Sequence, residues 1–153
     1  MSQSRDCAGW ETLGTVLAEG NPSLTAVDLS SNPISNKPFP TLAAGLGNCP
    51  LVTLDISGCE IGSKGTKDLI EALRDGRGAA TLRALDLSGN KVGESRGGSA
   101  AVAELLAAAR NLSTLLLAGS QVDVVEILEA AAASPALLVL DISGSLLVLC
   151  VCV

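Results

Sequence analysis

Aspartate recurs at one position of a phrase that the chain repeats, and a row of carboxylates could bind a positively charged partner. The fifth residue of the phrase is, from the first copy to the last, Asp28, Asp55, Asp86, Leu116 and Asp141. If the phrases are parallel strands, these side chains lie on one face, with about 4.8 Å between neighbouring strands. Such a face fits a basic protein surface. It fits a cation less well, because carboxylates in a flat row do not converge on one ion.

The same aspartates also have a purely structural interpretation. Aspartate at this place would belong to the usual pattern of the repeat, solvated and hydrogen-bonded to residues of neighbouring strands. That role is the commoner one for such residues, and partner binding is the alternative.

Catalysis and metal binding find little support in the sequence. The chain has no histidine, so a serine or cysteine nucleophile would lack its usual base. Cys150 and Cys152 form a C-x-C pair without a second pair or a histidine, which is not the spacing of a zinc site. The segment 96–99 (RGGS) lacks the lysine that a phosphate-binding loop requires. We predict no catalytic residue, no metal and no cofactor.

The charge balance narrows the class of partner. Ten Lys and Arg residues face 16 Asp and Glu residues, for a net charge of −6. Nucleic acids and anionic membranes require clustered positive charge, so we expect neither as the main partner. A modest basic cluster is interpreted as a solvated helix face, with a partner contact as the alternative; it comprises Lys64, Lys67, Arg74 and Arg77. The apolar stretch 136–153 contains Asp141 and only just reaches the roughly 17 to 25 residues of a membrane helix, so no membrane insertion is expected.

An eleven-residue phrase recurs five times and predicts the fold. The copies begin at Leu24, Leu51, Leu82, Leu112 and Leu137, so successive spacings are 27, 31, 30 and 25 residues. Leucines at the first, fourth and sixth positions would point inward from a short strand. The spacing leaves room for a helix after each strand. The phrase therefore predicts an α/β leucine-rich repeat solenoid of about five repeats, with parallel strands on its concave face and helices on its convex face.

The ninth position of the phrase turns the chain away from the strand. Its residues are Asn32, Cys59, Asn90, Ser120 and Ser145. A side chain there can satisfy buried backbone groups of neighbouring coils. The residue ten places after each first leucine is apolar in every copy, as Ile34, Ile61, Val92, Val122 and Leu147.

Amphipathic patterns predict a helix before the first phrase and one between each pair of phrases. The segments are 10–20, 40–46, 63–75, 99–110 and 123–133. Ser63 and Asp123 stand where helix caps are expected. Gly76 and Pro135 stand where helices should end. In the last helix we expect Val124, Ile127, Leu128 and Ala131 to face inward.

The ends of the chain lack the polar caps that a solenoid requires. It starts with the helical half of a repeat, and it ends in the fifth repeat with the uncharged segment 146–153 (LLVLCVCV). We therefore expect a single repeat domain, 1–153, that is a fragment or truncated product. We also expect the isolated chain to self-associate, in part through this segment.

Ribonuclease-inhibitor-like repeats occur in NOD-like receptors, tropomodulin-like proteins and the CARMIL family (capping protein regulator and myosin 1 linker). The segments 21–35, 62–73, 81–90 and 122–145, with their uneven spacing, resemble the repeat domain of the CARMIL family. NOD-like receptor repeats are more regular. The resemblance implies an actin-regulatory scaffold at the cell cortex.

The sequence thus favours a non-enzymatic protein-interaction scaffold that regulates actin organisation, with protein partners that could be basic. The alternative is the ligand-recognition domain of a NOD-like innate immune receptor or of a ribonuclease-inhibitor-like protein. The first ten residues contain no apolar run, and the five cysteines have no disulfide-framework spacing. We therefore expect a cytoplasmic protein.

Overall fold

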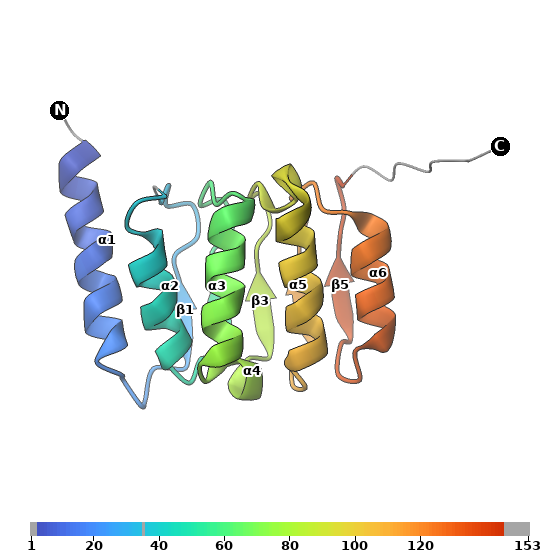
Figure 1. Cartoon of the computed structure of the whole chain (residues 1–153). Coiled ribbons are helices and arrows are strands. Elements are labelled where there is room, and N and C mark those ends of the chain that lie inside the picture. The colour runs from blue at the N-terminus through green and yellow to red at the C-terminus, as the bar shows by residue number, and fades with distance from the viewer. Residues whose placement is uncertain (1–2, 35, 146–153) are drawn as a thin grey trace.

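The structure is a computed structural model, and it describes residues 3–34 and 36–145. Helices and short strands alternate along the chain and form two layers (Figure 1). The strands are β1 (Ala26–Asp28), β2 (Thr53–Asp55), β3 (Ala84–Asp86), β4 (Thr114–Leu116) and β5 (Val139–Asp141). The helices of the outer layer are α1 (Gln3–Ala18), α2 (Phe39–Asn48), α3 (Ser63–Asp75), α5 (Arg96–Ala108) and α6 (Val124–Ala133). Two short helices, α4 (Gly78–Thr81) and η1 (Val92–Glu94), flank β3.

The five strands form one parallel sheet in the order β1-β2-β3-β4-β5. Each phrase contributes one strand, and the phrases align position by position. Leu54 pairs with Leu85, and Leu85 pairs with Leu115, and each of these side chains is no more than 2% exposed. The leucines pack beneath the helices and form one aliphatic core. The predicted leucine-rich repeat solenoid of about five repeats is therefore confirmed.

A tight turn follows each strand and requires backbone conformations that favour glycine. The eighth phrase residue has a positive φ in every coil, and it is glycine in four of them: Gly58, Gly89, Gly119 and Gly144, with φ of 63°, 66°, 66° and 71°. Ser31 takes this place in the first coil with φ 57°. Glycine enters this left-handed region at no steric cost, which explains its recurrence.

The helices pack side by side through close backbone approaches. A Cβ atom at Gly45 of α2 would collide with the Gly14 carbonyl oxygen of α1, and one at Gly76 would collide with the Gly47 carbonyl oxygen. Glycine at these positions lets neighbouring helices approach closely. The N–H of Arg77 then donates to the Gly47 carbonyl at 2.9 Å and joins two coils on the helix side.

The predicted helices are present, with different boundaries at several ends. The 63–75 segment agrees with α3, whereas α1 begins at Gln3 and α5 at Arg96, earlier than the apolar pattern indicated. Asp123 is the predicted cap of α6: its carboxylate accepts from the N–H groups of Val125 and Glu126. Gly76 ends α3 as expected.

Two details of the helix prediction are wrong. Gly62, rather than Ser63, precedes the first turn of α3, and the Ser63 hydroxyl instead donates to the Val92 carbonyl of the next coil at 2.7 Å. Leu128 was expected inside but is 47% exposed, because α6 packs against α5 on one side and has no described helix on the other. Among the described residues, no helix has the length and apolarity to cross a membrane. The predictions for Leu147, Cys150, Cys152 and the segment 146–153 fall outside the described residues.

Candidate protein-interaction face

The sheet brings the aspartates of the repeat into one row. Asp28 pairs in register with Asp55, Asp55 with Asp86, and Leu116 stands between Asp86 and Asp141. Asp28 is exposed and the other three aspartates are partly buried. The fourth phrase residue, which directly precedes the fifth in each strand, is buried under the helices in the central coils. Because successive residues of a strand point to opposite faces, the aspartates lie on the open face of the sheet. This is the arrangement that the sequence predicted for the candidate face.

Each of these carboxylates also accepts a hydrogen bond within its own coil. Its Oδ1 atom accepts a hydrogen bond from the N–H of the serine two residues later, over 2.8–2.9 Å: Asp28 to Ser30, Asp55 to Ser57, Asp86 to Ser88 and Asp141 to Ser143. The structural interpretation predicts hydrogen bonds to neighbouring strands, and on this point it is wrong. The bond instead closes the turn of the same coil. Within the described residues, the second oxygen of Asp55 and of Asp86 has no hydrogen-bond partner.

The pairing of aspartate and serine is visible in the sequence itself. Four coils contain Asp-x-Ser, whereas the fourth coil contains Leu116 and Ala118 at the same two positions. Both polar residues are thus lost together. This joint loss supports a shared task within the turn, and it could have been found without a structure.

The turn bond affects titration at the two ends of the row. Hydrogen bonds from the Ser30 hydroxyl and N–H lower the pKa of Asp28 below its ordinary value. Bonds from the N–H and hydroxyl of Ser143 lower the pKa of Asp141 in the same way. Donors directed at a carboxylate favour its charged form, so these two groups stay negative to a lower pH than an ordinary aspartate does.

The turn-position residues link successive coils. Asn90 is 1% exposed; its Nδ2 donates to the Ile56 carbonyl at 2.8 Å, and its Oδ1 accepts from the N–H groups of Cys59 and Ile61 at 3.1 and 3.0 Å. Ser120 donates in the same direction, to the Leu87 carbonyl at 2.8 Å.

Cysteine can take the same place. The Cys59 thiol donates to the Leu29 carbonyl at 3.1 Å, and burial raises its pKa. A neutral, buried thiol here supports packing between coils and is a poor nucleophile.

The first and last turn positions differ from the central three. Asn32 is exposed, and its amide donates only within its own coil, to the carbonyls of Leu29 and Ser30. The Ser145 hydroxyl is buried and has no partner among the described residues. Hydrogen bonding between coils through this position is therefore concentrated in the middle of the solenoid.

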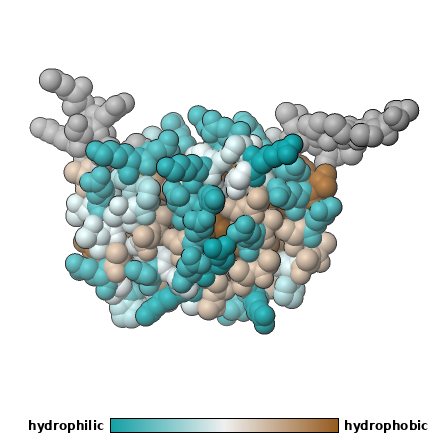
Figure 2. Space-filling view, in the orientation of Figure 1, coloured by the Kyte–Doolittle hydropathy of each residue, from teal (hydrophilic) through white to brown (hydrophobic). Residues whose placement is uncertain are grey.

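Two members of the basic cluster, Lys67 and Arg74 of α3, form ion pairs with acidic side chains. Lys67 lies 3.8 Å from Glu71, and Arg74 bridges Asp75 at 3.1 Å and Glu104 of α5 at 2.7 Å. Asp75 is the main reason that the pKa of Arg74 is raised. Figure 2 shows hydrophilic residues gathered over the middle of this helix face. The cluster fits the solvated helix face that the sequence favoured, and the bridge from Arg74 to Glu104 joins α3 to α5.

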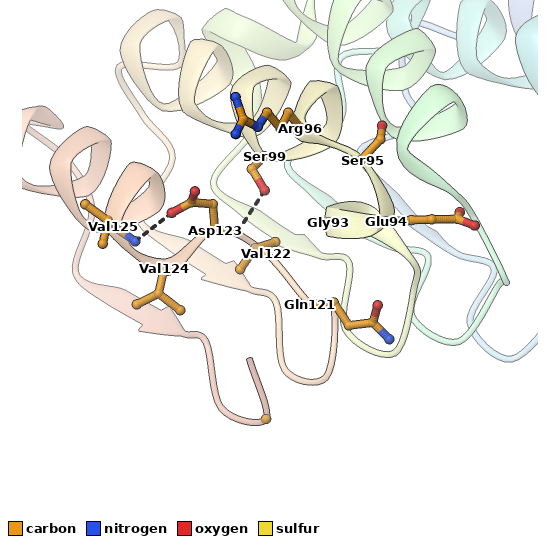
Figure 3. A pocket seen from close by; sticks show the side chains of 11 residues that line it. Gly93, Glu94, Ser95, Arg96, Ser99, Gln121, Val122, Asp123, Val124 and Val125 are labelled. Atoms are coloured by element: carbon orange, nitrogen blue, oxygen red, sulfur yellow. Dashed lines mark hydrogen bonds between the residues drawn. The ribbon is translucent and has the colours of Figure 1, made fainter. Parts of the chain in front are cut away.

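A groove of about 630 Å³ opens where the chain enters α5 and α6 (Figure 3). Two of its polar side chains bond the backbone: the Ser99 hydroxyl accepts from the Asp123 N–H at 3.0 Å, and Asp123 caps α6. No set of three potential metal ligands occurs in the part of the chain that the structure describes. The sequence did not predict this groove, because it forms between loops of different coils.

The repeated coil defines the class of fold: this chain has a leucine-rich repeat fold. The sequence profile described as Leucine Rich repeat matches residues 20–37, 47–69 and 78–95. No curated protein sequence gives a significant match.

Two solved structures with a similar fold are a leiomodin and a tropomodulin. The structure titled Leiomodin-1 Actin-Binding Site 2 aligns with a TM-score of 0.69 at 15% identity, covering 88% of this chain and 79% of that one. The tropomodulin C-terminal domain of Caenorhabditis elegans aligns with a TM-score of 0.66 at 16% identity, covering 88% and 82%. Identities this low establish the shared fold alone.

Proposed function

We propose that this chain is a non-enzymatic protein-interaction domain that binds a basic protein surface on the open face of its sheet. The observation that carries the proposal is the row of aspartates in register on that face. The central pair, Asp55 and Asp86, each keep one carboxylate oxygen free of hydrogen bonds within the described residues. A row with free oxygens offers lysine and arginine side chains of a partner a set of acceptors at regular spacing.

The partner we propose belongs to the actin machinery, and the place of action is the cell cortex. Two independent resemblances support this choice. The repeat segments resemble the CARMIL family of actin regulators, and one structure of similar fold is titled as an actin-binding site of leiomodin-1. Actin itself is therefore the first probe to use.

The test measures binding of actin monomers and filaments to the chain and to an Asp55→Asn, Asp86→Asn double variant. Asparagine keeps an oxygen acceptor for the turn but removes both charges. We expect the association rate of the double variant to fall, and the wild-type rate to fall as salt shortens the Debye length from about 30 Å at 0.01 M to about 8 Å at 0.15 M. A matched control, Asp68→Asn with Glu71→Gln, removes two charges from α3 in the helix layer and should leave the rate closer to that of the wild type.

The outcomes separate the two parts of the proposal. Binding that the double variant and the control weaken equally would reject the sheet face as the binding surface. No binding of actin in either form would reject actin, and a partner captured from cytosol could then be compared with the same three proteins. Unchanged kinetics of the double variant with that partner would overturn the proposed face.

A further inference from the structure

The two ends of the solenoid present different halves of a coil. Each of the strands β1 to β4 is followed by a helix of the outer layer, from α2 to α6. Within the described residues, α1 stands at one end with no strand of its own, and β5 stands at the other end with no helix of its own (Figure 1). A helix without a strand and a strand without a helix together make one complete coil.

Exposed large apolar side chains lie at these two ends, four of them at the end formed by α6 and β5 and one on α1. The large hydrophobic residues that are exposed in the described part of the chain are Val16 of α1, Val125 and Leu128 of α6, and Leu138 and Val139 at β5. Leu138 is the most exposed, at 84%, and Val16 is 57% exposed. Figure 2 shows hydrophobic residues at the end where α6 and β5 lie. Clusters of this kind mark surfaces that bind another protein.

Core positions of the repeat are also incompletely covered in the terminal coils. The first, fourth and sixth phrase residues of coils two to four are no more than 2% exposed, whereas those of the first and last coils are only partly buried: Leu24, Val27, Leu29, Leu137, Leu140 and Ile142. The buried hydroxyls without a partner in the described residues are Ser134, at the C-terminal end of α6, and Ser145, after β5. Both ends therefore leave apolar surface that another coil would cover.

The backbone at the two ends is complementary in the register of the sheet. Between internal strands, the sixth N–H donates to the fifth carbonyl of the next coil, as from Ile56 to Asp86 at 3.1 Å, and the second N–H of that coil donates back, as from Arg83 to Val52 at 2.8 Å. Among the described residues, the equivalent backbone groups without a partner at β5 are the Ile142 N–H and the Leu138 carbonyl. At β1 they are the Asp28 carbonyl and the Thr25 N–H. Each free donor at one end thus has its acceptor at the other.

We propose that copies of this chain associate head to tail, with β1 and α1 of one copy continuing the sheet and the helix layer of another after β5 and α6. The contact repeats the packing between internal coils, so the incoming α1 packs beside Leu128, on the side of α6 where the described residues provide no helix. A symmetric contact between two β5 ends would leave that place empty. A head-to-tail contact is heterologous and can continue to a third copy.

The test uses one variant at each end of the full chain. Val16→Asp places a charge on the α1 end and Leu138→Asp places one on the β5 end. Both side chains are exposed, so both variants should fold, which circular dichroism checks.

In sedimentation velocity, the apparent mass of the wild type should exceed the 15.3 kDa of the monomer and should rise with protein concentration. Each variant alone should associate at least about tenfold more weakly. Ala107→Asp, on an exposed position of α5, is the matched control and should behave as wild type.

Mixing the two variants gives the decisive result. Each variant keeps one intact end, so an equimolar mixture should form a dimer that cannot grow further. A symmetric contact through β5 predicts that Val16→Asp still dimerises and that mixing restores nothing, which would overturn the proposal. A wild type that stays monomeric at all concentrations would also overturn it. Association that persists in Leu138→Asp but is abolished by deletion of residues 146–153 would overturn the proposal as well.

Discussion

Asn90 shows how much of the fold depends on a single amide. Its side chain serves three backbone groups of the preceding coil and is buried, so its removal leaves those groups without their protein partner. Buried donors and acceptors left without partners cost about 1 to 3 kcal/mol each. Asn32 holds the same position in the phrase but is exposed and bonds only within its own coil.

We therefore predict that Asn90→Ala lowers the free energy of unfolding by about 3 kcal/mol or more, and Asn32→Ala by less than about 1 kcal/mol. Urea denaturation of the two variants measures both values. Equal losses would show that the turn-position bonds between coils contribute little.

The Asp-x-Ser turn makes stability depend on pH. Because the folded pKa of Asp28 and of Asp141 lies below the ordinary value, their contribution is complete above that value and is lost as pH falls through the lowered pKa. We expect Tm to decrease from about pH 4 downward. In Ser30→Ala the pKa of Asp28, measured by NMR titration, should rise toward its ordinary value. Ser23→Ala, on the loop before β1, should leave it unchanged.

At the scale of elements, α1 depends on a glycine contact. Gly14 and Gly45 allow α1 and α2 to touch through their backbones, and any side chain at Gly45 must push the helices apart. Trp10, the single tryptophan of the chain, lies partly buried on α1 and reports this contact.

Gly45→Val should therefore destabilise the protein by about 1 to 3 kcal/mol and shift the Trp10 emission to longer wavelength under conditions where the sheet stays folded. Gly97→Ala is the control, because a Cβ there meets no atom within 4 Å. It should be neutral or stabilising by up to about 1 kcal/mol. An unchanged emission spectrum in Gly45→Val would show that the interface adapts to the added side chain.

At the scale of the molecule, the repeat determined what could be predicted. Leucines at fixed positions of the phrase specify strand, inward face and register together, so the sheet followed from five aligned segments. Contacts between coils were harder to foresee. The Ser63 hydroxyl bonds Val92, 29 residues away, and the sequence near Ser63 suggested only a helix cap. The pattern of α6 identified the apolar Leu128 but not whether a neighbouring helix covers it.

The candidate face was predictable for a similar reason. Equal phrase positions place Asp55 and Asp86 side by side, whereas their bonds to Ser57 and Ser88 depend on turn geometry. Only the joint change to Leu116 and Ala118 in the fourth coil indicated that aspartate and serine act together.

The uneven distribution of turn-position bonds makes the solenoid a short one-dimensional chain of coupled units. Asn90 and Ser120 couple the middle coils, whereas Asn32 bonds its own coil and Ser145 has no partner among the described residues. In such a chain, opening starts at the ends and moves inward, and the last units to open share the full free energy of unfolding. Amide hydrogens of β3 should therefore exchange with deuterium most slowly, and those of β1 and β5 fastest. Mass spectrometry after timed labelling would show this gradient, and uniform exchange along the sheet would mean that the five coils open as one unit.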